Sequence, residues 1–338
     1  MKYAILRKPH QNVRYFEAIK TLMVNEVIIT AKGLKAQISV PVYESIGGLE
    51  LLTFTCDELT PEFQSALGRV SSNLILFEVV GELLRPVMDG LKTYFPEDLS
   101  RILKYNGKTN EDFTSLMLTV AVMSSDFAGE FDQKLSILDP MCGRGTTLYE
   151  SLIRGYDSAG VEQDKQAVSE VDKYLKRYLK YGKYKHEASH QTIHLSGTKN
   201  GTKYTIETAD SAEHFKAKDR RTVQFASGDT AEVNKFYKKN SFHSVLTDLP
   251  YGVQHKGGER GVWVDLTQTL KKAGPEWFKM LRRGGTLVIA YNTYHLKRSE
   301  LDPIFEAAGF TALNTGVYAN FEHWVEQAVN RDILVYKK

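Results

Sequence analysis

Hydrophobic positions in the first ninety residues follow strand-like and helix-like spacings in turn. Helical spacing predicts helices over 13–24 and from Pro61 onward, where proline suits the first helical position. Apolar or β-branched runs predict strands at 2–8, 27–30, 38–42, 49–54 and 73–80. The order is close to β-α-β-β-α-β, which predicts a small α+β domain of the ferredoxin-like type.

Beyond residue 135, short apolar runs alternate with stretches of helical spacing. The strand-like runs lie at 135–140, 158–164, 222–229, 242–252 and 286–292. This alternation predicts an α/β unit with a mostly parallel sheet, in which ligands bind at the carboxyl ends of the strands. The segment 182–221 is longer than a crossover connection needs, so we expect an inserted hairpin there with Asn200-Gly201 as its turn.

Length and composition suggest a two-domain globular protein. At 338 residues the chain is about twice a typical domain. We therefore expect a small α+β domain at 1–95, a helical connector at 96–125 and a larger α/β domain at 126–338. The content of 42% hydrophobic and 25% charged residues excludes a disordered or collagen-like chain.

The sequence also disfavours membrane-spanning, secreted and cysteine-rich classes of protein. No apolar run approaches the ~18 residues of a membrane span, and the N-terminus lacks a signal-peptide block, so a cytoplasmic protein without membrane contact is expected. Cys56 and Cys142 stand alone, which predicts neither a disulfide framework nor a cysteine zinc site. No metal site is predicted.

The distribution of charge along the chain says more about a possible nucleic-acid partner than the net charge does. The net charge of +3, from 44 basic and 41 acidic residues, is too small to indicate a nucleic-acid partner. The segment from Lys165 to Arg221, however, contains 13 basic and 7 acidic residues. This local excess of +6 fits either a solvated surface or a contact with nucleic acid. Tyr174, Tyr178 and Tyr181 in this segment share one helix face, so we expect them to pack against the core.

The first candidate site is the run DPMCGRGTT at 139–147, between a predicted strand and a predicted helix. Two glycines let the backbone approach a ligand, and a helix start offers free N–H groups. A dinucleotide fingerprint would need Gly or Ala where Leu148 stands, and no Gly-Lys-Ser/Thr follows, so neither the dinucleotide nor the P-loop pattern is met. Glu162, at the end of the next strand, is suited to hold ribose hydroxyls of an adenosine-containing cofactor.

The second candidate site is the run TDLPYG at 247–252, at the end of another predicted strand. Together with 139–147, Glu162 and Asp229, it resembles class I S-adenosylmethionine-dependent methyltransferases that modify exocyclic amino groups. Within these, DPMCGRGTT and TDLPYGV are most similar to tRNA guanine-N2 methyltransferases and their uncharacterised relatives. The resemblance covers roughly residues 105–338 and implies a Rossmann-like, mostly parallel sheet with S-adenosylmethionine as cofactor.

The resemblance also implies roles for matching residues. The loop 139–145 would hold the methionine part of the cofactor, Glu162 its ribose and Asp229 its adenine amino group, with Asp210 as the alternative for the adenine. Cofactor binding is thus expected at Phe113, Thr114, Asp139, Pro140, Cys142, Gly143, Gly145, Thr146, Glu162 and Asp229. Catalysis is expected at Asp248, Leu249, Pro250 and Tyr251.

The chemistry of a base amine explains the second run. The lone pair of such an amine is delocalised into the ring, so acceptors on its N–H groups can localise it toward a sulfonium methyl. Asp248 and the Leu249 carbonyl would be these acceptors, and Tyr251 would stack on an extruded base. The family pattern has proline where Leu249 stands. Because that position is thought to act through its carbonyl, leucine can serve.

The leading function is therefore methylation of a nucleobase amine, with guanine N2 in tRNA as the expected substrate. The tRNA members of the family usually carry a THUMP domain, which we do not recognise in the short N-terminal region; that region could instead position RNA. The alternatives are a DNA adenine-N6 methyltransferase and a catalytically silent RNA-binding module in which Leu249 marks a degraded site. The expected partner is nucleic acid, and no protein partner is predicted.

Overall fold

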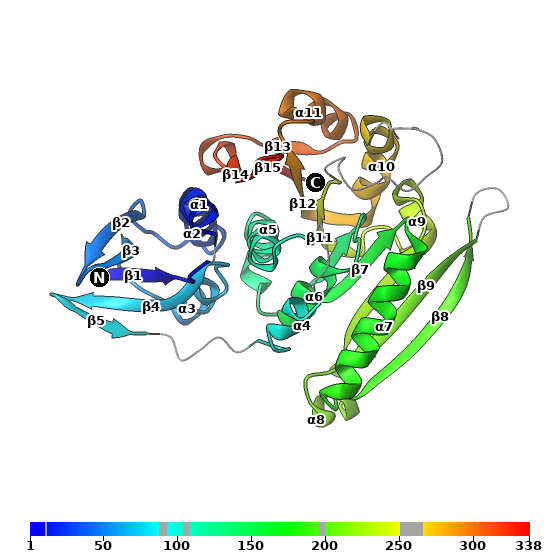
Figure 1. Cartoon of the computed structure of the whole chain (residues 1–338), viewed down its shortest axis with the longest axis horizontal. Coiled ribbons are helices and arrows are strands. Elements are labelled where there is room, and N and C mark those ends of the chain that lie inside the picture. The colour runs from blue at the N-terminus through cyan, green and yellow to red at the C-terminus, as the bar shows by residue number, and fades with distance from the viewer. Residues whose placement is uncertain (11, 88–92, 104–107, 196–199, 251–265) are drawn as a thin grey trace.

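The computed structural model describes residues 1–10, 12–87, 93–103, 108–195, 200–250 and 266–338. These residues form two units side by side, each built on one β-sheet (Figure 1). The smaller unit contains the N-terminus and a five-stranded sheet, and the larger contains a ten-stranded sheet. Every helix in this part of the chain is too short or too polar to cross a membrane.

The smaller unit has the split arrangement that the sequence predicts. Its elements are β1 (Lys2–Arg7), α1 (Val13–Ala18), α2 (Lys20–Gly33), β2 (Val42–Ile46), β3 (Leu49–Thr55), α3 (Pro61–Gly68), β4 (Asn73–Val80) and β5 (Leu83–Pro86). The strand order is β2-β3-β1-β4-β5, and neighbouring strands are antiparallel. With β5 as an added edge strand, this is the ferredoxin-like order, so the predicted fold class is confirmed for this unit.

Two predicted strands of the smaller unit are placed differently. Residues 27–30 were expected as a strand and lie inside α2. Val27 packs toward the small sheet whereas Ile29 packs toward the larger unit, so this helix is buried on two sides. Such burial outweighs the weak strand preference of β-branched residues. The following strand begins at Val42, and Ile38 forms an isolated bridge to Cys56.

The larger unit alternates strands and helices along the chain. Its helices are α4 (Asp98–Arg101), α5 (Glu111–Met123), α6 (Thr146–Ile153), α7 (Lys165–Tyr181), α8 (Ala212–Lys216), α9 (Val233–Phe236), α10 (Leu266–Met280) and α11 (Arg298–Ala307), with short 3-10 turns at Ala128–Glu130, Thr230–Glu232 and Gly316–Ala319. Its strands are β6 (Ser136–Asp139), β7 (Asp157–Glu162), β8 (His186–His194), β9 (Asn200–Thr208), β10 (Arg221–Ser227), β11 (Phe242–Asp248), β12 (Leu281–Asn292), β13 (Thr311–Leu313), β14 (His323–Glu326) and β15 (Val329–Lys337).

The order of these strands defines the fold. It runs β13-β15-β12-β11-β6-β7-β10-β9-β8, with β14 paired to β15. The five central strands, β12 to β10, are parallel, and β15 inserts antiparallel between β12 and β13. This is the Rossmann-like sheet of class I methyltransferases, as the sequence predicts. Helices α5, α6 and α7 cover one face, and α9, α10 and α11 cover the other.

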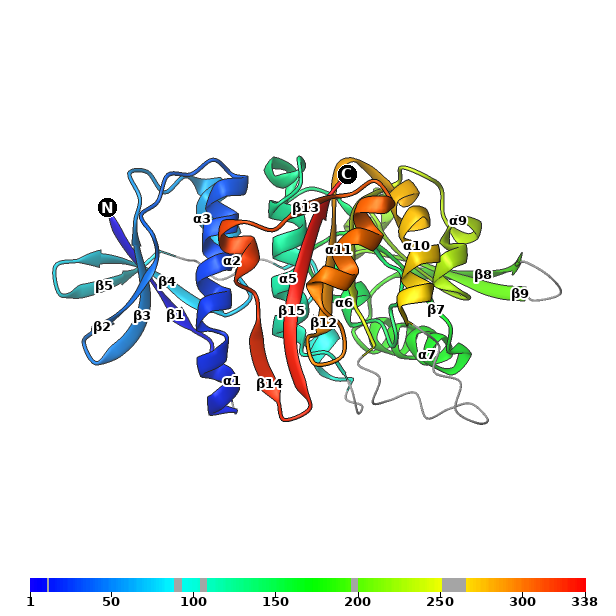
Figure 2. The same cartoon turned by 90° about the horizontal axis from the view of Figure 1, so that it is seen from above.

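Residues 96–125 were expected to connect the two units. Within them, α5 instead packs on β11 and β12 and contacts α2 of the smaller unit. Figure 2 shows α1 and α2 on one side of α5, with β14 beside them. The α5 helix therefore belongs to the larger unit and forms the surface on which the smaller unit docks.

The segment 182–221 adds an edge to the sheet. Strands β8 and β9 pair antiparallel over nine residue pairs, and β9 continues antiparallel onto β10. Asn200 and Gly201, expected to form the turn, are instead paired with His194 and Ile193 inside the ladder. Gly201 is needed there because an added Cβ would lie 2.4 Å from the Ser227 carbonyl oxygen. The glycine marks a close approach of two backbones.

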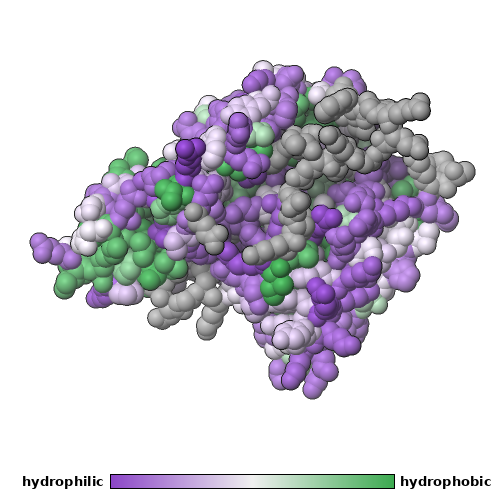
Figure 3. Space-filling model, viewed as in Figure 1, coloured by the Kyte–Doolittle hydropathy of each residue, from purple (hydrophilic) through white to green (hydrophobic). Residues whose placement is uncertain are grey.

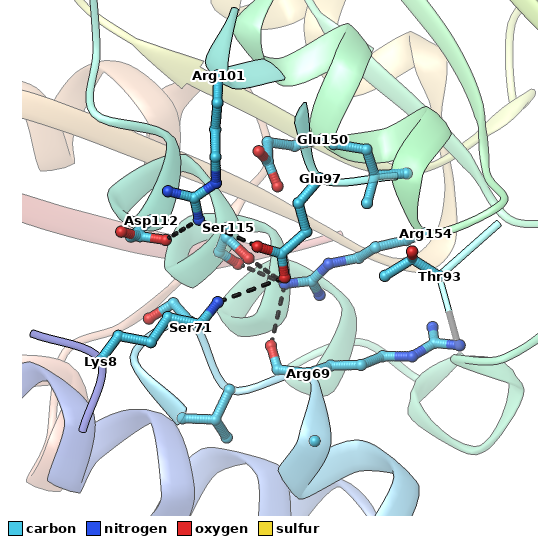
Figure 4. A pocket seen from close by; sticks show the side chains of 13 residues that line it. Lys8, Arg69, Ser71, Thr93, Glu97, Arg101, Asp112, Ser115, Glu150 and Arg154 are labelled. Carbon is cyan, nitrogen blue, oxygen red and sulfur yellow. Dashed lines mark hydrogen bonds and ion pairs between the residues drawn. The ribbon is translucent and has the colours of Figure 1, made fainter. Parts of the chain in front are cut away.

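Polar groups fill the junction between the units (Figure 4). Arg154, at the end of α6, has Nη2 at 2.8–3.2 Å from the Arg69 carbonyl oxygen, the Ser115 carbonyl and hydroxyl oxygens and the Thr119 hydroxyl. Glu26 of α2 is fully buried and accepts hydrogen bonds from the Ser71 amide and hydroxyl at 2.9 and 2.7 Å. The junction is therefore a specific, hydrogen-bonded interface.

Candidate active site

The candidate residues lie at the carboxyl ends of four strands, β6, β7, β10 and β11, which are neighbours in the sheet. The register places Asp139 opposite Gly160 and Glu162 opposite Ser227, and Leu138 lies opposite Val245 three residues before Asp248. The sheet thus brings the predicted residues Asp139, Glu162 and Asp248 to one edge.

The loop after β6 is a tight glycine turn. Gly143 and Gly145 have φ angles of +50° and +87°, a backbone conformation that other residues rarely adopt. The Gly145 amide donates to the Cys142 carbonyl at 2.8 Å, and the Cys142 amide donates to the Val161 carbonyl at 2.9 Å. A Cβ added to Gly143 would meet open space, so this loop presents bare backbone on its outer side. A ligand can therefore approach it closely.

The other residues expected to bind the cofactor on this loop are buried in the protein. Pro140 and Thr146 are buried, and Thr146 is the first residue of α6. Burial raises the pKa of the Cys142 thiol well above its usual value, so the thiol stays neutral. Its sulfur fills the space above Gly160, where an added Cβ would lie 2.6 Å from it. The structure thus places the Cys142 side chain in the packing beneath the loop.

Glu162 ties the glycine loop to the end of β7. Its Oε2 accepts from the Gly143 amide at 2.9 Å, and its Oε1 accepts from the Asp164 amide at 2.8 Å. Each carboxylate oxygen has further lone pairs, which is the arrangement that two hydroxyls of a ribose need. The neighbouring Gly228 amide donates to the Glu162 carbonyl at 2.9 Å, which holds the start of the next loop alongside.

Asp139 is a buried carboxyl with a perturbed acidity. It is 4% exposed and accepts from the Met141 amide at 3.1 Å. Burial raises its pKa to about 7, and the negative charge of Asp248 adds to this effect. A buried carboxylate favours a cationic ligand, because a positive charge would stabilise its ionised form.

Asp229 and Asp210, the two candidates for the adenine, are separated by the sheet. Asp229 is exposed directly after β10, beside Glu162, and its Oδ1 accepts from the Ala231 amide at 2.9 Å. Asp210 follows β9, which runs antiparallel to β10, so it lies at the opposite edge and pairs there with His214 at 2.5 Å. Only Asp229 of the two lies beside the glycine loop.

The end of β11 carries the expected acceptor. Asp248 is half-buried, and its Oδ2 accepts from the Thr109 hydroxyl at 2.7 Å. Leu249 is 2% exposed in the apolar cluster of the sheet, and its amide donates to the Ala290 carbonyl at 2.9 Å. Proline has no N–H to donate to the Ala290 carbonyl, and its ring would fill less of the apolar cluster. Leucine therefore suits this backbone position. Pro250 is exposed, and Tyr251 lies outside the described residues.

Phe113 and Thr114 begin α5, above this edge. The Phe113 ring is buried with the Arg331 guanidinium 4.1 Å and the His323 ring 5.4 Å from its centroid. The Thr114 hydroxyl donates to the Asn110 carbonyl at 3.2 Å and is buried as well. The structure thus packs Phe113 toward β14 and β15.

Sequence reasoning missed Thr109, which contacts Asp248, and Tyr15, whose pKa responds to the charge of Asp248. Thr109 precedes α5 by two residues, and no local pattern marks its contact with a strand 139 residues away. Tyr15 of α1 is buried, and its pKa is raised to about 12 mainly by burial, with the Asp248 charge contributing. Its ring lies 6.3 Å from that of His323, whose pKa burial lowers to about 4. Tyr15 of the smaller unit therefore lies against His323 of β14, which in turn lies against Phe113 of α5.

The carboxylates of the site match the parts of S-adenosylmethionine. Buried Asp139 suits the cationic methionine end, the carboxylate of Glu162 suits a diol, and exposed Asp229 suits the adenine amino group. The glycine loop leaves room for a ligand against bare backbone. The residues present therefore fit this cofactor.

Comparison with known proteins gives a family. Residues 113–301, more than half of the chain, match the family model UPF0020, described as the RMKL-like methyltransferase domain. No curated protein matches the chain in sequence.

Solved structures resemble the chain at low identity. TrmN from Thermus thermophilus is 13% identical with a TM-score of 0.41, over 71% of this chain and 52% of that one. The chain thus spans about half the length of TrmN. The PH0226 protein from Pyrococcus horikoshii is 12% identical with a TM-score of 0.39, over 72% and 99% of the two chains. An rRNA methylase from Streptococcus thermophilus is 13% identical with a TM-score of 0.35, over 64% and 94%.

The family match and the strand order agree on the class of protein. Both indicate a methyltransferase with a class I fold and S-adenosylmethionine as its cofactor. The chain belongs to the UPF0020 family of RMKL-like methyltransferase domains.

Proposed function

We propose that this methyltransferase modifies an exocyclic amino group of a nucleobase, with guanine N2 in tRNA as the leading substrate. The observation that most supports the proposal is the position of Asp248. Its carboxylate ends β11 next to the strand that carries the glycine loop, is half-buried and has one oxygen oriented by Thr109. A fixed acceptor at this place can bind the N–H of an amine and direct its lone pair.

The residues of the chain would divide the work as follows. The loop 139–145, Glu162 and Asp229 would hold the cofactor, which supplies an electrophilic methyl group when bound. Asp248 and the Leu249 carbonyl would accept hydrogen bonds from the two N–H groups of the amine, and Tyr251 would stack on the base. Positioning the amine in line with the methyl group supplies much of the acceleration. In this proposal, residues 1–95 form a domain that helps to position the RNA.

The test is to identify the methylated nucleoside. Purified protein is incubated with labelled S-adenosylmethionine and either unmodified tRNA or unmethylated DNA, and the digested product is analysed by mass spectrometry. We expect N2-methylguanosine from tRNA. N6-methyladenine from DNA would show that the substrate is DNA adenine and that the proposed methylation of a base amine is right. Intact cofactor binding without any product would contradict the proposal and favour the silent RNA-binding module.

Cofactor binding should depend on pH through Asp139. Its pKa of about 7 means that the carboxylate is mostly protonated below this pH and cannot pair with a cation. The ionised fraction falls tenfold per pH unit there, so the dissociation constant of S-adenosylmethionine should rise about tenfold per unit below pH ~7 and level off above it. Calorimetric titration between about pH 5.5 and 8.5 measures this.

A matched control is available for this experiment. Glu150 also has a pKa raised to about 7 by burial, but it lies in the junction between the units. Glu150→Gln should therefore keep the pH profile, whereas Asp139→Asn should bind weakly at every pH. A flat profile for the wild-type protein would remove Asp139 from the cofactor site.

A further inference from the structure

A dense group of cations lies where α7 ends and the chain turns into β8. The thirteen residues 173–185 read KYLKRYLKYGKYK and contain six basic residues and no acidic one. Their charge exceeds the net charge of +3 of the whole chain. We call them the basic ridge, made of Lys173, Lys176, Arg177, Lys180, Lys183 and Lys185.

Helix geometry aligns four members of the ridge. Lys173, Lys176, Arg177 and Lys180 are spaced i, i+3, i+4 and i+7, which places them on one face of α7. The opposite face is buried through Val171, Leu175 and Leu179, so the cations point away from the sheet. With a rise of 1.5 Å per residue, the four span about 10 Å along the helix.

The ridge has little internal compensation. Lys176 pairs with Asp172 at 2.7 Å. Among the residues that the structure describes, the other five cations take part in no ion pair within 4.0 Å, and all five are exposed. Like charges three and four residues apart destabilise a helix, and the helix dipole offsets this cost at Lys180 in the last turn of α7. A bound polyanion would turn this repulsion between the cations into attraction between the ridge and its ligand.

Aromatic rings accompany these cations. Tyr174 and Tyr178 point inward, and their hydroxyls donate to the Leu99 carbonyl and the Asp98 carboxylate, each at 2.5 Å. Tyr181, expected to pack with them, is 91% exposed at the last residue of α7. An exposed ring among unpaired cations suits a nucleic acid, which offers both phosphates and stacking surfaces.

The ridge is rigidly connected to the candidate site. α7 starts at Lys165, three residues after Glu162, and runs away from the carboxyl edge as one straight element (Figure 1). The ridge therefore begins about 12 Å along the helix from the start of α7. Figure 3 shows hydrophilic residues gathered over this side of the molecule. A chain whose base enters the site can continue along α7.

We infer that the basic ridge binds the phosphate backbone of the RNA substrate. The inference rests on the proposed function, because it assumes that the substrate is a nucleic acid. The ridge contacts phosphates and not base edges, so its contribution is independent of sequence and sensitive to salt. An anionic membrane is the less suitable partner because the apolar face of α7 is already buried in the protein.

The test compares two triple variants with equal changes of charge. K173Q/R177Q/K180Q removes three cations of the ridge. K271Q/K272Q/R283Q removes three exposed cations from α10 and the start of β12, on the other side of the sheet. Binding of an unmodified tRNA transcript is measured by fluorescence anisotropy without S-adenosylmethionine, between about 50 and 300 mM salt. Thermal melting checks that both variants fold.

The ridge variant should bind at least about tenfold more weakly at 0.1 M salt, and its slope of log K against log salt should shrink by about 2 to 3. The control variant should keep the wild-type slope. An unchanged slope in the ridge variant, or an equal loss in both variants, overturns the inference, as does ridge-dependent binding to phosphatidylserine vesicles without an effect on RNA. Ridge-dependent RNA binding without methylation of any nucleic acid would leave the inference standing and refute the proposed function.

Discussion

Replacing Asp248 with alanine is expected to lower the rate of methyl transfer by about 10³-fold or more while leaving cofactor binding and folding intact. The carboxylate is the acceptor that localises the amine lone pair in the proposed reaction, and removal of one such fixed polar group typically costs 10²- to 10³-fold or more. Asp248 is half-buried at the end of β11 and is not part of the apolar core, so its loss should not unfold the sheet.

Two further variants separate catalysis from positioning. Asp248→Asn keeps the shape and one acceptor oxygen but loses the negative charge, so it should retain a small part of the activity. Thr109→Val removes the hydroxyl that donates to Asp248 at 2.7 Å and should lower the rate about tenfold, by loosening the carboxylate. Single-turnover kinetics with tRNA measure all three. Wild-type turnover in Asp248→Ala would refute the assignment of the site.

The parts of the site that the sequence predicts are those that depend on short segments. Gly143 and Gly145 occupy positive φ angles in a turn between a strand and a helix, and this need is visible in nine consecutive residues. Glu162 and Asp248 end their strands, and adjacent parallel strands bring such ends together without further information. The order of strands and helices likewise follows from alternation along the chain.

The parts that could not be predicted depend on packing between distant segments. Residues 27–30 become helical because both sides of α2 are buried, one against each unit. Gly201 is a glycine because of the Ser227 backbone and not because of a turn. Tyr181 has the spacing of its packed neighbours but lies beyond the protein surface that covers them. No local pattern indicates that Thr109 lies near Asp248.

The second large expected effect is on the free energy of unfolding and concerns Arg154 at the junction between the two units. Arg154 lies partly buried at the junction, and its Nη2 donates to one oxygen of the smaller unit, the Arg69 carbonyl, and to three oxygens of α5. Burial lowers the pKa of its guanidinium, yet the group remains charged. Figure 4 shows it opposite Arg69 and Ser115, at the centre of the polar junction.

Arg154→Met should therefore lower the free energy of unfolding by about 2 kcal/mol, because it removes a charged donor from four oxygens. The Thr119 hydroxyl, which also donates to the Arg69 and Ser115 carbonyls at 3.2 and 3.1 Å, limits the loss. Urea titration should show a lower midpoint with the slope unchanged. Arg85→Met is the matched control: Arg85 pairs with Glu78 on the exposed edge of the small sheet, and its loss should change the free energy by less than about 0.5 kcal/mol. Equal effects of both substitutions would show that the junction is no stronger than a surface ion pair. The expected difference reflects the place of Arg154, which joins α5 of the larger unit to the Arg69 carbonyl of the smaller unit.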